Sequence, residues 1–354
     1  MRRVRAGFAL PAVLTVIAII TLVFLVAIQA LDSLAAETRN VRDEMRFRQA
    51  ALTQEARAAL LISLSPFTLN GVEIGGRRIS SAEALGGGMA EDLSEAGEAP
   101  AVQRLALDGR IYGATGLLGQ PVYVRLQDAA GQVNLNWLTH EQQRRLFLRL
   151  GVSPGDADMM ADRMGDYLDP DDLRRPRGAE AQEYVRAGAQ RPANASVIRV
   201  QEIQGVLGIR EMVARPRWNE LEPHLVADPT NALFNVNTAS PLALAIMFDM
   251  DLARADGVIQ RRRTEPFYSF EEFAGFAGVA PAGELDQSYI LPNGRLTLMV
   301  IDPAAGLVYR SRLVMLPANP IRPVWVEDQS LTPLSPELRR LDYRDVERFP
   351  TPGA

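Results

Sequence analysis

Acidic side chains crowd into one short stretch of the chain. Six carboxylates lie between residues 166 and 183, around a proline and a glycine that allow tight turning: Asp166, Asp169, Asp171, Asp172, Glu180 and Glu183. Hard oxygen ligands at this density suit Ca²⁺, which takes six to eight oxygens at about 2.3–2.6 Å. The stretch therefore predicts a calcium site built on one loop.

A second interpretation assigns the same acids to ion pairs on a solvated surface. Arg174, Arg175 and Arg177 lie among them and could neutralise them. The spacing from Asp169 to Glu180 matches positions one and twelve of an EF-hand, but Arg174 stands where that loop needs glycine. An EF-hand is therefore not predicted, and the residues alone leave calcium and ion pairing open.

Catalysis is not indicated elsewhere. The chain has two histidines, His140 after the Thr139 helix cap and His224 after a proline, and we expect both at the surface. Neither has metal-binding spacing, and the sequence has no Gly-x-Ser-x-Gly motif or phosphate loop. Carboxylates crowded into one loop favour a bound cation over the separated acid and base of a hydrolase. We therefore expect a protein that is not an enzyme.

Composition also argues against nucleic acid as a partner. Lys plus Arg number 38 against 43 Asp plus Glu, and the chain of 354 residues has no cysteine. Stretches such as 196–209 and 237–273, the latter with Arg261, Arg262 and Arg263, resemble helix-hairpin-helix modules. Those modules need surrounding basic charge, whereas the net charge here is -5. The three arginines are instead predicted to be a solvated helix end.

The N-terminus predicts a membrane segment that continues as a long helix. Basic residues precede Phe8–Ile28, a run without charge that can span roughly 30 Å of hydrocarbon. This order predicts a cytoplasmic N-terminus and a translocated remainder. Apolar residues then recur at helical steps until Ser65 and Pro66, where the helix should end: Leu31, Leu34, Val41, Met45, Leu52, Ala56 and Leu60.

The rest of the chain reads as a sheet interrupted by helices. Strand-like runs occupy 67–79, 105–112 and 122–126, with a predicted mobile loop at 84–100, and strand character returns at 296–301, 307–315 and 324–326. Helical periodicity fills the interval between the two groups. The predicted fold class is α+β, with a large all-α domain inserted into an antiparallel sheet whose flanking strands pair across the insertion.

An Asn-x-Asn motif occurs twice, at Asn134 and at Asn235. Each copy precedes a helix start, one marked by the capping-box spacing of Thr139 and Gln142 and the other by Ser240 followed by a proline. The acidic stretch lies between the copies. The acidic stretch between two copies of Asn-x-Asn is a recognisable order of motifs in this chain.

The leader resembles that of type IV pilins and pseudopilins. In that family, a short basic leader ends in glycine before Phe-Ala-Leu and an apolar run, and prepilin peptidase cuts after the glycine and methylates the new N-terminus. The resemblance places the cut between Gly7 and Phe8. Most members carry a glutamate at mature position five, where this chain has Ala12. Because that acid neutralises the N-terminus of a neighbouring subunit, its absence fits a position at the tip of a fibre.

With the repeated Asn-x-Asn and the acidic loop, the chain from Met1 to about Trp325 resembles the K-type minor pseudopilins of the type II secretion system. The resemblance implies a protein that caps the tip of the periplasmic pseudopilus and binds Ca²⁺ in its head. It also implies a single-pass position in the inner membrane with a periplasmic head. The implied partners are prepilin peptidase, minor pseudopilins I, J and H, and the major pseudopilin G.

The predicted organisation follows from the patterns and the resemblance together. It comprises a leader (1–7), a membrane and core helix (8–65), the first part of a pilin-type domain (66–133), an inserted helical domain (134–291), the second part of the sheet (292–326) and a flexible tail (327–354). Two alternatives stay open. One is a minor pilin of a type IV pilus or competence system, and the other is a membrane-anchored periplasmic metal-dependent hydrolase.

Overall fold

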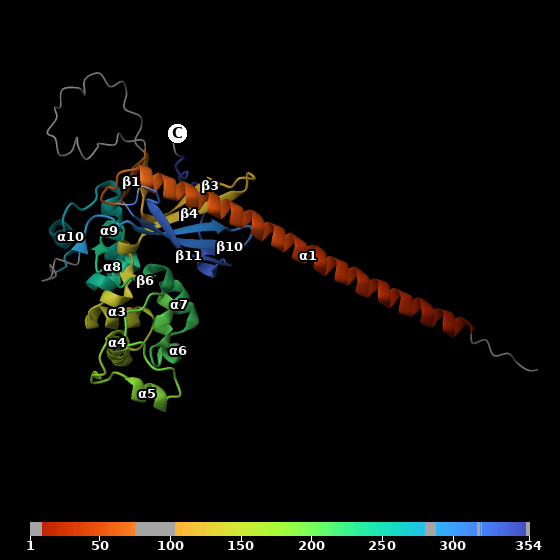
Figure 1. Cartoon of the computed structure of the whole chain (residues 1–354), viewed down its shortest axis with the longest axis horizontal. Coiled ribbons are helices and arrows are strands. Elements are labelled where there is room, and N and C mark those ends of the chain that lie inside the picture. The colour runs from red at the N-terminus through yellow and green to blue at the C-terminus, as the bar shows by residue number, and fades with distance from the viewer. Residues whose placement is uncertain (1–8, 75–102, 280–287, 317–318, 320, 352–354) are drawn as a thin grey trace, which may run out of the picture.

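A single uninterrupted helix begins the described part of the chain. The computed structural model describes residues 9–74, 103–279, 288–316, 319 and 321–351, so Gly7, Phe8 and the predicted loop at 84–100 lie outside it. Helix α1, Ala9–Leu64, has 56 residues and is about 80 Å long. It ends just before Pro66, and its outer half extends away from the head (Figure 1). The predicted continuous helix is confirmed.

The inner half of α1 packs on a sheet through one narrow face. The fully buried residues of this face include Phe47, Ala50, Ala58 and Leu61, which recur at steps of three, eight and three. The predicted apolar stripe from Leu31 to Leu60 is not this face, because each of its members is exposed. Helix α1 therefore carries two apolar faces, one that packs into the head and one that is uncovered.

In the described part of the chain, five strands form the main antiparallel sheet in the order β11-β10-β9-β4-β3. Strands β4 and β9 pair from Tyr123 opposite Ile301 to Asp128 opposite Leu296, although the inserted domain separates them in sequence. The flanking strands thus pair across the insertion, as expected. The strands are β1 Gly71–Ile74, β2 Gln103–Ala106, β3 Asp108–Thr115, β4 Pro121–Asp128, β9 Arg295–Asp302, β10 Leu307–Met315 and β11 Val324–Pro333.

The expectation of a loose tail from residue 327 is wrong for the part that the structure describes. Strand β11 continues to Pro333, and helix α11, Pro336–Arg339, follows it. Arg348 then forms a bridge with Gly113 on β3, and Phe349 is buried. The charged and proline-rich composition suggested a tail, but backbone pairing with β10 and aromatic contacts of Tyr343 and Phe349 hold this segment on the sheet.

The inserted domain has its own core and lies beside the sheet on the side away from α1 (Figure 1). Two short parallel pairs, β5 with β6 and β7 with β8, begin at the two Asn-x-Asn motifs. Its elements are η1 Ala129–Gly131, β5 Val133–Asn134, η2 Leu135–Trp137, α3 His140–Arg149, α4 Pro154–Leu168, α5 Ala181–Arg186, η3 Val200–Gly205, α6 Ile209–Met212, α7 Arg215–Leu221, η4 Glu222–His224, β6 Leu225–Val226, β7 Phe234–Asn235, α8 Pro241–Phe248, α9 Leu252–Thr264, α10 Phe270–Ala277 and β8 Ser288–Tyr289.

Candidate cation site in the inserted domain

The acidic loop joins the end of α4 to the start of α5. Ser153 caps the N-terminus of α4, with Pro154 in its first turn, and Asp169 is the residue at which α4 ends. Helix α5 begins after Glu180, whose backbone N–H donates to Glu183 Oε2 at 3.2 Å. Two helix ends therefore fix the two ends of the loop.

Asp166 organises the interior of this loop. Its carboxylate is fully buried and accepts hydrogen bonds from the backbone N–H of Arg175 at 3.2 Å and from Arg175 Nη1 at 3.3 Å. A Cβ added at Gly178 would lie 1.8 Å from Asp166 Oδ2, so this position requires glycine. Asp166 thus shapes the loop from inside, which differs from the ligand role predicted for it.

Four oxygen atoms at the loop are buried without a hydrogen-bond partner among the described residues. They are both carboxylate oxygens of Glu180, Oδ1 of Asp169 and Oδ1 of Asn194. Asn194 has a left-handed backbone with φ 44°, and its Nδ2 donates to the carbonyl oxygen of Asp171 at 3.0 Å and to Asp172 Oδ1 at 3.3 Å. Buried polar groups are normally paired, so a cluster of unpaired oxygens indicates a missing positive partner.

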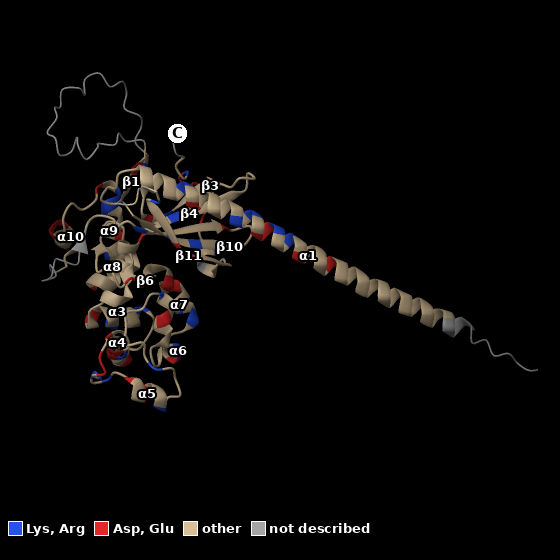
Figure 2. Cartoon of the chain, in the orientation of Figure 1, with Lys and Arg blue, Asp and Glu red and all other residues tan. Residues whose placement is uncertain are grey.

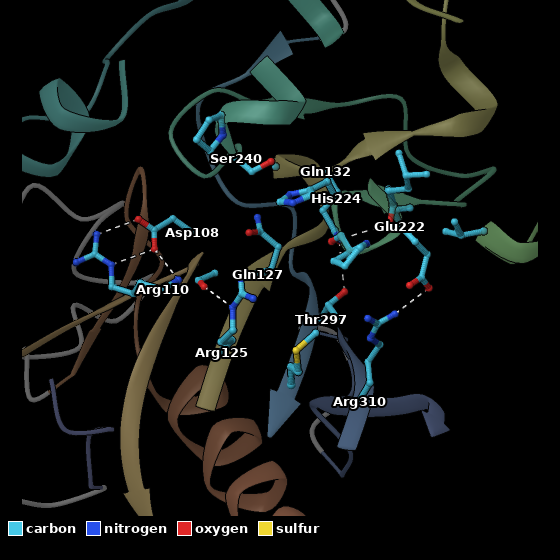
Figure 3. Close-up of a pocket in the computed structure, with 18 of the residues that line it drawn as sticks. Asp108, Arg110, Arg125, Gln127, Gln132, Glu222, His224, Ser240, Thr297 and Arg310 are labelled. Atoms are coloured by element: carbon cyan, nitrogen blue, oxygen red, sulfur yellow. Dashed lines mark hydrogen bonds and ion pairs between the residues drawn. The ribbon is translucent and has the colours of Figure 1, made fainter. Parts of the chain in front are cut away.

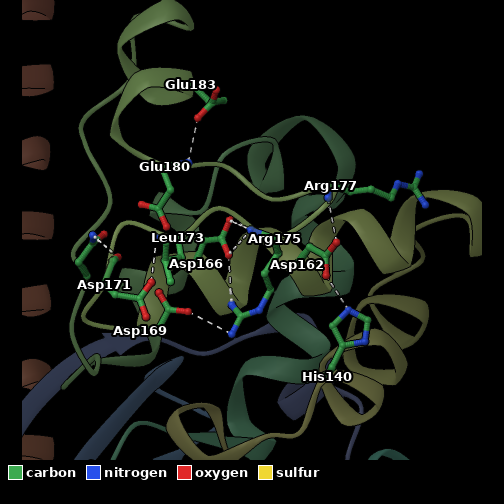
Figure 4. Close-up of polar contacts among 11 residues, drawn as sticks. His140, Asp162, Asp166, Asp169, Asp171, Leu173, Arg175, Arg177, Glu180 and Glu183 are labelled. Carbon is green, nitrogen blue, oxygen red and sulfur yellow. Dashed lines mark hydrogen bonds and ion pairs between the residues drawn. The ribbon is translucent and has the colours of Figure 1, made fainter.

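The electrostatics of the loop agree with this interpretation. Burial raises the pKa of Glu180, and the neighbouring carboxylates of Asp166 and Asp169 raise it further. Burial likewise raises the pKa of Asp169, against the lowering effect of Arg175, whose Nη2 lies 3.1 Å from Asp169 Oδ2. Figure 4 shows Glu180 and Asp169 directed into the loop. A divalent cation with oxygen ligands would satisfy these atoms.

The six predicted ligands do not all meet. Among the residues that the structure describes, no three acidic or imidazole groups converge into a ready-made metal cage. The Glu183 carboxylate is already paired, because it accepts from the backbone N–H of Glu180 (Figure 4) and forms ion pairs with Arg186 at 3.1 Å and with Arg174 at 3.8 Å. The set that fits a cation is therefore Asp169, Glu180 and Asn194 with backbone oxygens of the loop, and Asn194 was not found from the sequence.

Ion pairing accounts for only part of the acidic loop. Arg175 contacts two of the acids, as that interpretation expects. Arg177 instead uses Nη2 to bond the carbonyl oxygen of Gly155 at 2.8 Å, while its backbone N–H donates to Asp162. Arg174 and Arg175 thus contact acids of this loop, and neither of the two contacts Glu180 in the described structure.

The two histidines differ in exposure. His140 is exposed, with Nε2 2.9 Å from Asp162 Oδ1. His224 is only partly exposed, in contrast to the surface position expected, and it lines a cavity against the sheet, where burial and the nearby Arg125 lower its pKa to about 4. Arg262 also departs from the solvated helix end that we expected, since its side chain is buried.

Sequence and structure comparisons find relatives of one kind. Residues 125–230 and 234–289 match two family models, both described as type II secretion system protein K. Type II secretion system protein K of Pseudomonas aeruginosa is 34% identical over 166 residues, which are 44% of this chain and 48% of that protein. The protein of that name from Dickeya chrysanthemi is 29% identical over 164 residues, or 45% of this chain and 42% of that protein. The chain thus spans about half the length of these relatives in the matched regions.

The fold also matches a solved structure. The crystal structure of the GspK-GspI-GspJ complex from the type 2 secretion system of enterotoxigenic Escherichia coli contains a chain that aligns with a TM-score of 0.54 and 19% identity. The alignment covers 84% of the present chain and 99% of that chain. At this identity the match establishes a shared fold, in which helices are likewise combined with a sheet.

Proposed function

We propose that this chain is a member of the type II secretion system protein K family, a minor pseudopilin that caps the tip of a periplasmic fibre and takes part in protein export as a structural subunit rather than an enzyme. The observation that carries the proposal is the outer half of α1. An 18-residue stretch of this helix has a mean hydropathy of 2.8, and none of that stretch is buried in the chain itself. Figure 2 shows the outermost described part of α1 without Lys, Arg, Asp or Glu, so lipid or neighbouring helices must cover it.

The partners follow from the second apolar face of α1. Leu52 and Leu60 are exposed on the part of α1 that packs in the head, and Leu31 and Leu34 are exposed on the part that extends away from it. Helices of minor pseudopilins I, J and H and of the major pseudopilin G would cover this face in a fibre. The related GspK chain occurs in a complex with GspI and GspJ, which supports I and J as the nearest partners.

The membrane position supports the same role. The apolar half of α1 is long enough to cross a bilayer once, and arginines precede it in the sequence. We therefore place the chain in the inner membrane, with the head in the periplasm and a cytoplasmic N-terminus. Prepilin peptidase would remove the leader between Gly7 and Phe8. Incubation with that peptidase should remove seven residues, and an uncut chain would argue for a membrane-anchored protein of another class.

Copurification tests the subunit role directly. The full chain, expressed in detergent-soluble form with pseudopilins I and J of the same secretion system, should copurify with both. Leu52→Gln combined with Leu60→Gln should weaken this association, because both leucines lie on the uncovered face of α1. Leu252→Gln changes an equally exposed leucine on α9 and is the matched control. Full retention of both partners by the Leu52 and Leu60 variant would refute the proposed interface.

We also propose that Ca²⁺ binds the acidic loop through Asp169, Glu180 and Asn194. The unpaired buried oxygens of these residues support the assignment. Calorimetry of the full chain in detergent should show melting at lower temperature after addition of EGTA. Glu180→Gln should abolish that difference, whereas Glu183→Gln should retain it, since the Glu183 carboxylate is already paired with Arg186 and with the backbone N–H of Glu180. Melting of the wild-type chain that EGTA leaves unchanged would remove the calcium proposal.

A further inference from the structure

A cavity of about 360 Å³ lies where the sheet meets the inserted domain. Strands β3, β4, β9 and β10 form one wall, while η3, η4 and α9 form the other (Figure 3). Its volume is near the lower end of the range for sites that bind small molecules. The cavity lies apart from the acidic loop, since it shares no lining residue with that loop.

Arginine dominates the walls. Among the described residues that line the cavity, seven arginines stand against four acids. Asp108 pairs with Arg110 at 2.9 Å, and Glu222 pairs with Arg310 at 3.2 Å. In Figure 3 these two pairs stand at opposite sides of the view. The other two acids are exposed residues, so the deep part of the cavity has more guanidinium groups than carboxylates.

Arg262 is the most buried of these cations. Its side chain reaches the cavity from α9, and only 2% of the residue is exposed. Nη1 donates to the carbonyl oxygen of Val236 at 2.7 Å, but Nε has no partner in the described structure. No described carboxylate lies within ion-pair distance of it. A carbonyl oxygen satisfies one donor and leaves the positive charge without a counterion.

Arg125 is in a similar position on β4. Nε donates to the carbonyl oxygen of Gly109 at 2.6 Å, and no described acid pairs with the guanidinium. Burial lowers the pKa of Arg125, and the positive charge of Arg310 adds to this lowering. Asp108 lies near enough to stabilise both Arg125 and Arg262, yet its own bonded partner is Arg110. The Asp108 carboxylate is therefore shared among Arg110, Arg125 and Arg262.

We propose that this cavity binds a small oxyanion of the phosphate or carboxylate class, with Arg125 and Arg262 as its charge partners. Guanidinium groups present paired N–H donors that match the oxygens of such anions, and they favour them over single-point acceptors. His224, on the same wall, is kept neutral by burial beside Arg125, so it can either donate or accept a hydrogen bond to the anion.

Binding would join the two parts of the head. Arg125 belongs to the sheet and Arg262 to the inserted domain, so an anion that contacts both would hold these units together. An anion that binds the folded chain and not the unfolded chain raises the melting temperature in a saturable way. This consequence does not depend on assembly into a fibre, because the cavity lies within one chain.

The test is titration of the full chain in detergent micelles with sodium phosphate, and separately with sodium acetate, at constant pH and ionic strength. EDTA is included so that Ca²⁺ cannot contribute. We expect a saturable rise in melting temperature and a calorimetric isotherm for at least one of the two anions. A response to phosphate alone identifies the phosphate class, and a response to acetate alone or to both extends the site to a carboxylate, such as one on a peptide.

Three substitutions make the result specific. Arg125→Gln should weaken anion binding at least tenfold. Arg263→Gln changes an exposed arginine that also lines the cavity, and it should weaken binding by a smaller factor. The Arg263 variant replaces the Arg125 variant in the test if Arg125→Gln does not fold. Arg340→Gln changes an exposed arginine that does not line the cavity and should leave the affinity unchanged. The proposal is overturned if neither anion gives a saturable response, or if the folded cavity variants bind as tightly as the wild type.

Discussion

Replacing Asp128 with asparagine should change how the stability of the head depends on pH. Asp128 ends strand β4, where the sheet meets the inserted domain, and its side chain is fully buried. Oδ2 accepts hydrogen bonds from Asn235 Nδ2 at 3.0 Å and from Thr238 Oγ1 at 2.8 Å. Oδ1 accepts from the backbone N–H groups of Ala130 at 3.2 Å and Asn293 at 3.3 Å. The contacts contain no counterion.

The magnitude follows from the pKa of this carboxyl group. Burial raises the pKa of Asp128 from 3.8 to about 6, in spite of the four hydrogen bonds that lower it. Because the folded pKa is raised, the stabilising contribution is fully present below pH 3.8 and is lost as the pH rises through 6. At about 1.36 kcal/mol per pKa unit, this loss amounts to about 3 kcal/mol.

His224 has the opposite effect on the pH dependence of stability, over nearly the same pH interval. Its pKa falls from 6.5 to about 4, chiefly through burial, so the folded state favours the neutral ring. The stability that it contributes is present above pH 6.5 and is lost as the pH falls toward 4, again by about 3 kcal/mol. The two groups therefore offset each other in the wild-type chain. Asp128→Asn should leave a head that weakens in acid, and His224→Gln one that weakens as the pH rises.

Urea unfolding of the full chain in detergent, followed by tryptophan fluorescence between pH 4 and pH 7, measures these slopes. Trp137 and Trp218 lie in the inserted domain and report on its unfolding. Asp128→Asn also places an amide where Asn235 donates, which adds a loss of about 1–3 kcal/mol at every pH. Asp43→Asn, on the exposed part of α1, is the control. If the free-energy difference between wild type and Asp128→Asn is the same at every pH, the reasoning is wrong.

Two further substitutions test contacts that hold distant segments together. Asn237→Ala removes a side chain that forms hydrogen bonds with both the N–H and the carbonyl oxygen of Phe267. This substitution should lower the free energy of unfolding by about 3 kcal/mol, because two buried bonds are lost. Asn136→Ala should lower it by less, because Asn136 is less buried than Asn237. Equal losses would show that burial does not set the difference. Arg57→Ala removes the guanidinium that holds the C-terminal segment on α1, so trypsin should cleave faster after the exposed Arg348. An unchanged cleavage rate would show that Arg57 is not needed to hold that segment.

The long helix and the sheet could be predicted because their signals are local. Helix α1 lacks internal glycine and proline from residue 12 to residue 64, and the strands alternate as expected. The sequence could not tell which apolar face of α1 packs in the head. Phe47, Ala50 and Ala58 are buried, whereas Leu52 and Leu60 are exposed, and hydrophobicity favours the wrong set. Small residues allow the helix to approach the sheet closely, and this depends on the partner surface rather than on the helix.

The C-terminal segment was missed because its stabilising contacts are not visible as a hydrophobic pattern. Strand β11 is an edge strand whose residues are mostly exposed, so its pairing with β10 depends on backbone hydrogen bonds. After α11, Tyr343 stacks on Tyr123 and Phe349 is buried, and two separated aromatics among charges and prolines are a weak signal. Arg57 reaches this segment from nearly 300 residues away in the chain.

The candidate site was only partly predictable for a related reason. Clustered acids marked the loop, but Asn194 reaches it from a separate segment with a left-handed backbone that only the fold defines. Arg262 carried a usable signal, because Ala255, Val258 and Ile259 lie on the same helical face and are buried with it. Reading three consecutive arginines as one charged end concealed that periodicity.

The two Asn-x-Asn motifs explain how one insertion can contain separate sites. The Asn136 side chain forms hydrogen bonds with both the N–H and the carbonyl oxygen of Val197, and the Asn237 side chain does the same with Phe267. Each side chain therefore makes the pair of backbone hydrogen bonds that a neighbouring strand would otherwise make. The first copy lies in residues 125–230 with the acidic loop, and the second lies in residues 234–289. Through Asn235, the second copy also bonds Asp128 at the end of the sheet. Because the cation loop and the junction with the sheet are anchored in different copies, loss of the cation should loosen the first copy while the sheet stays paired across the insertion.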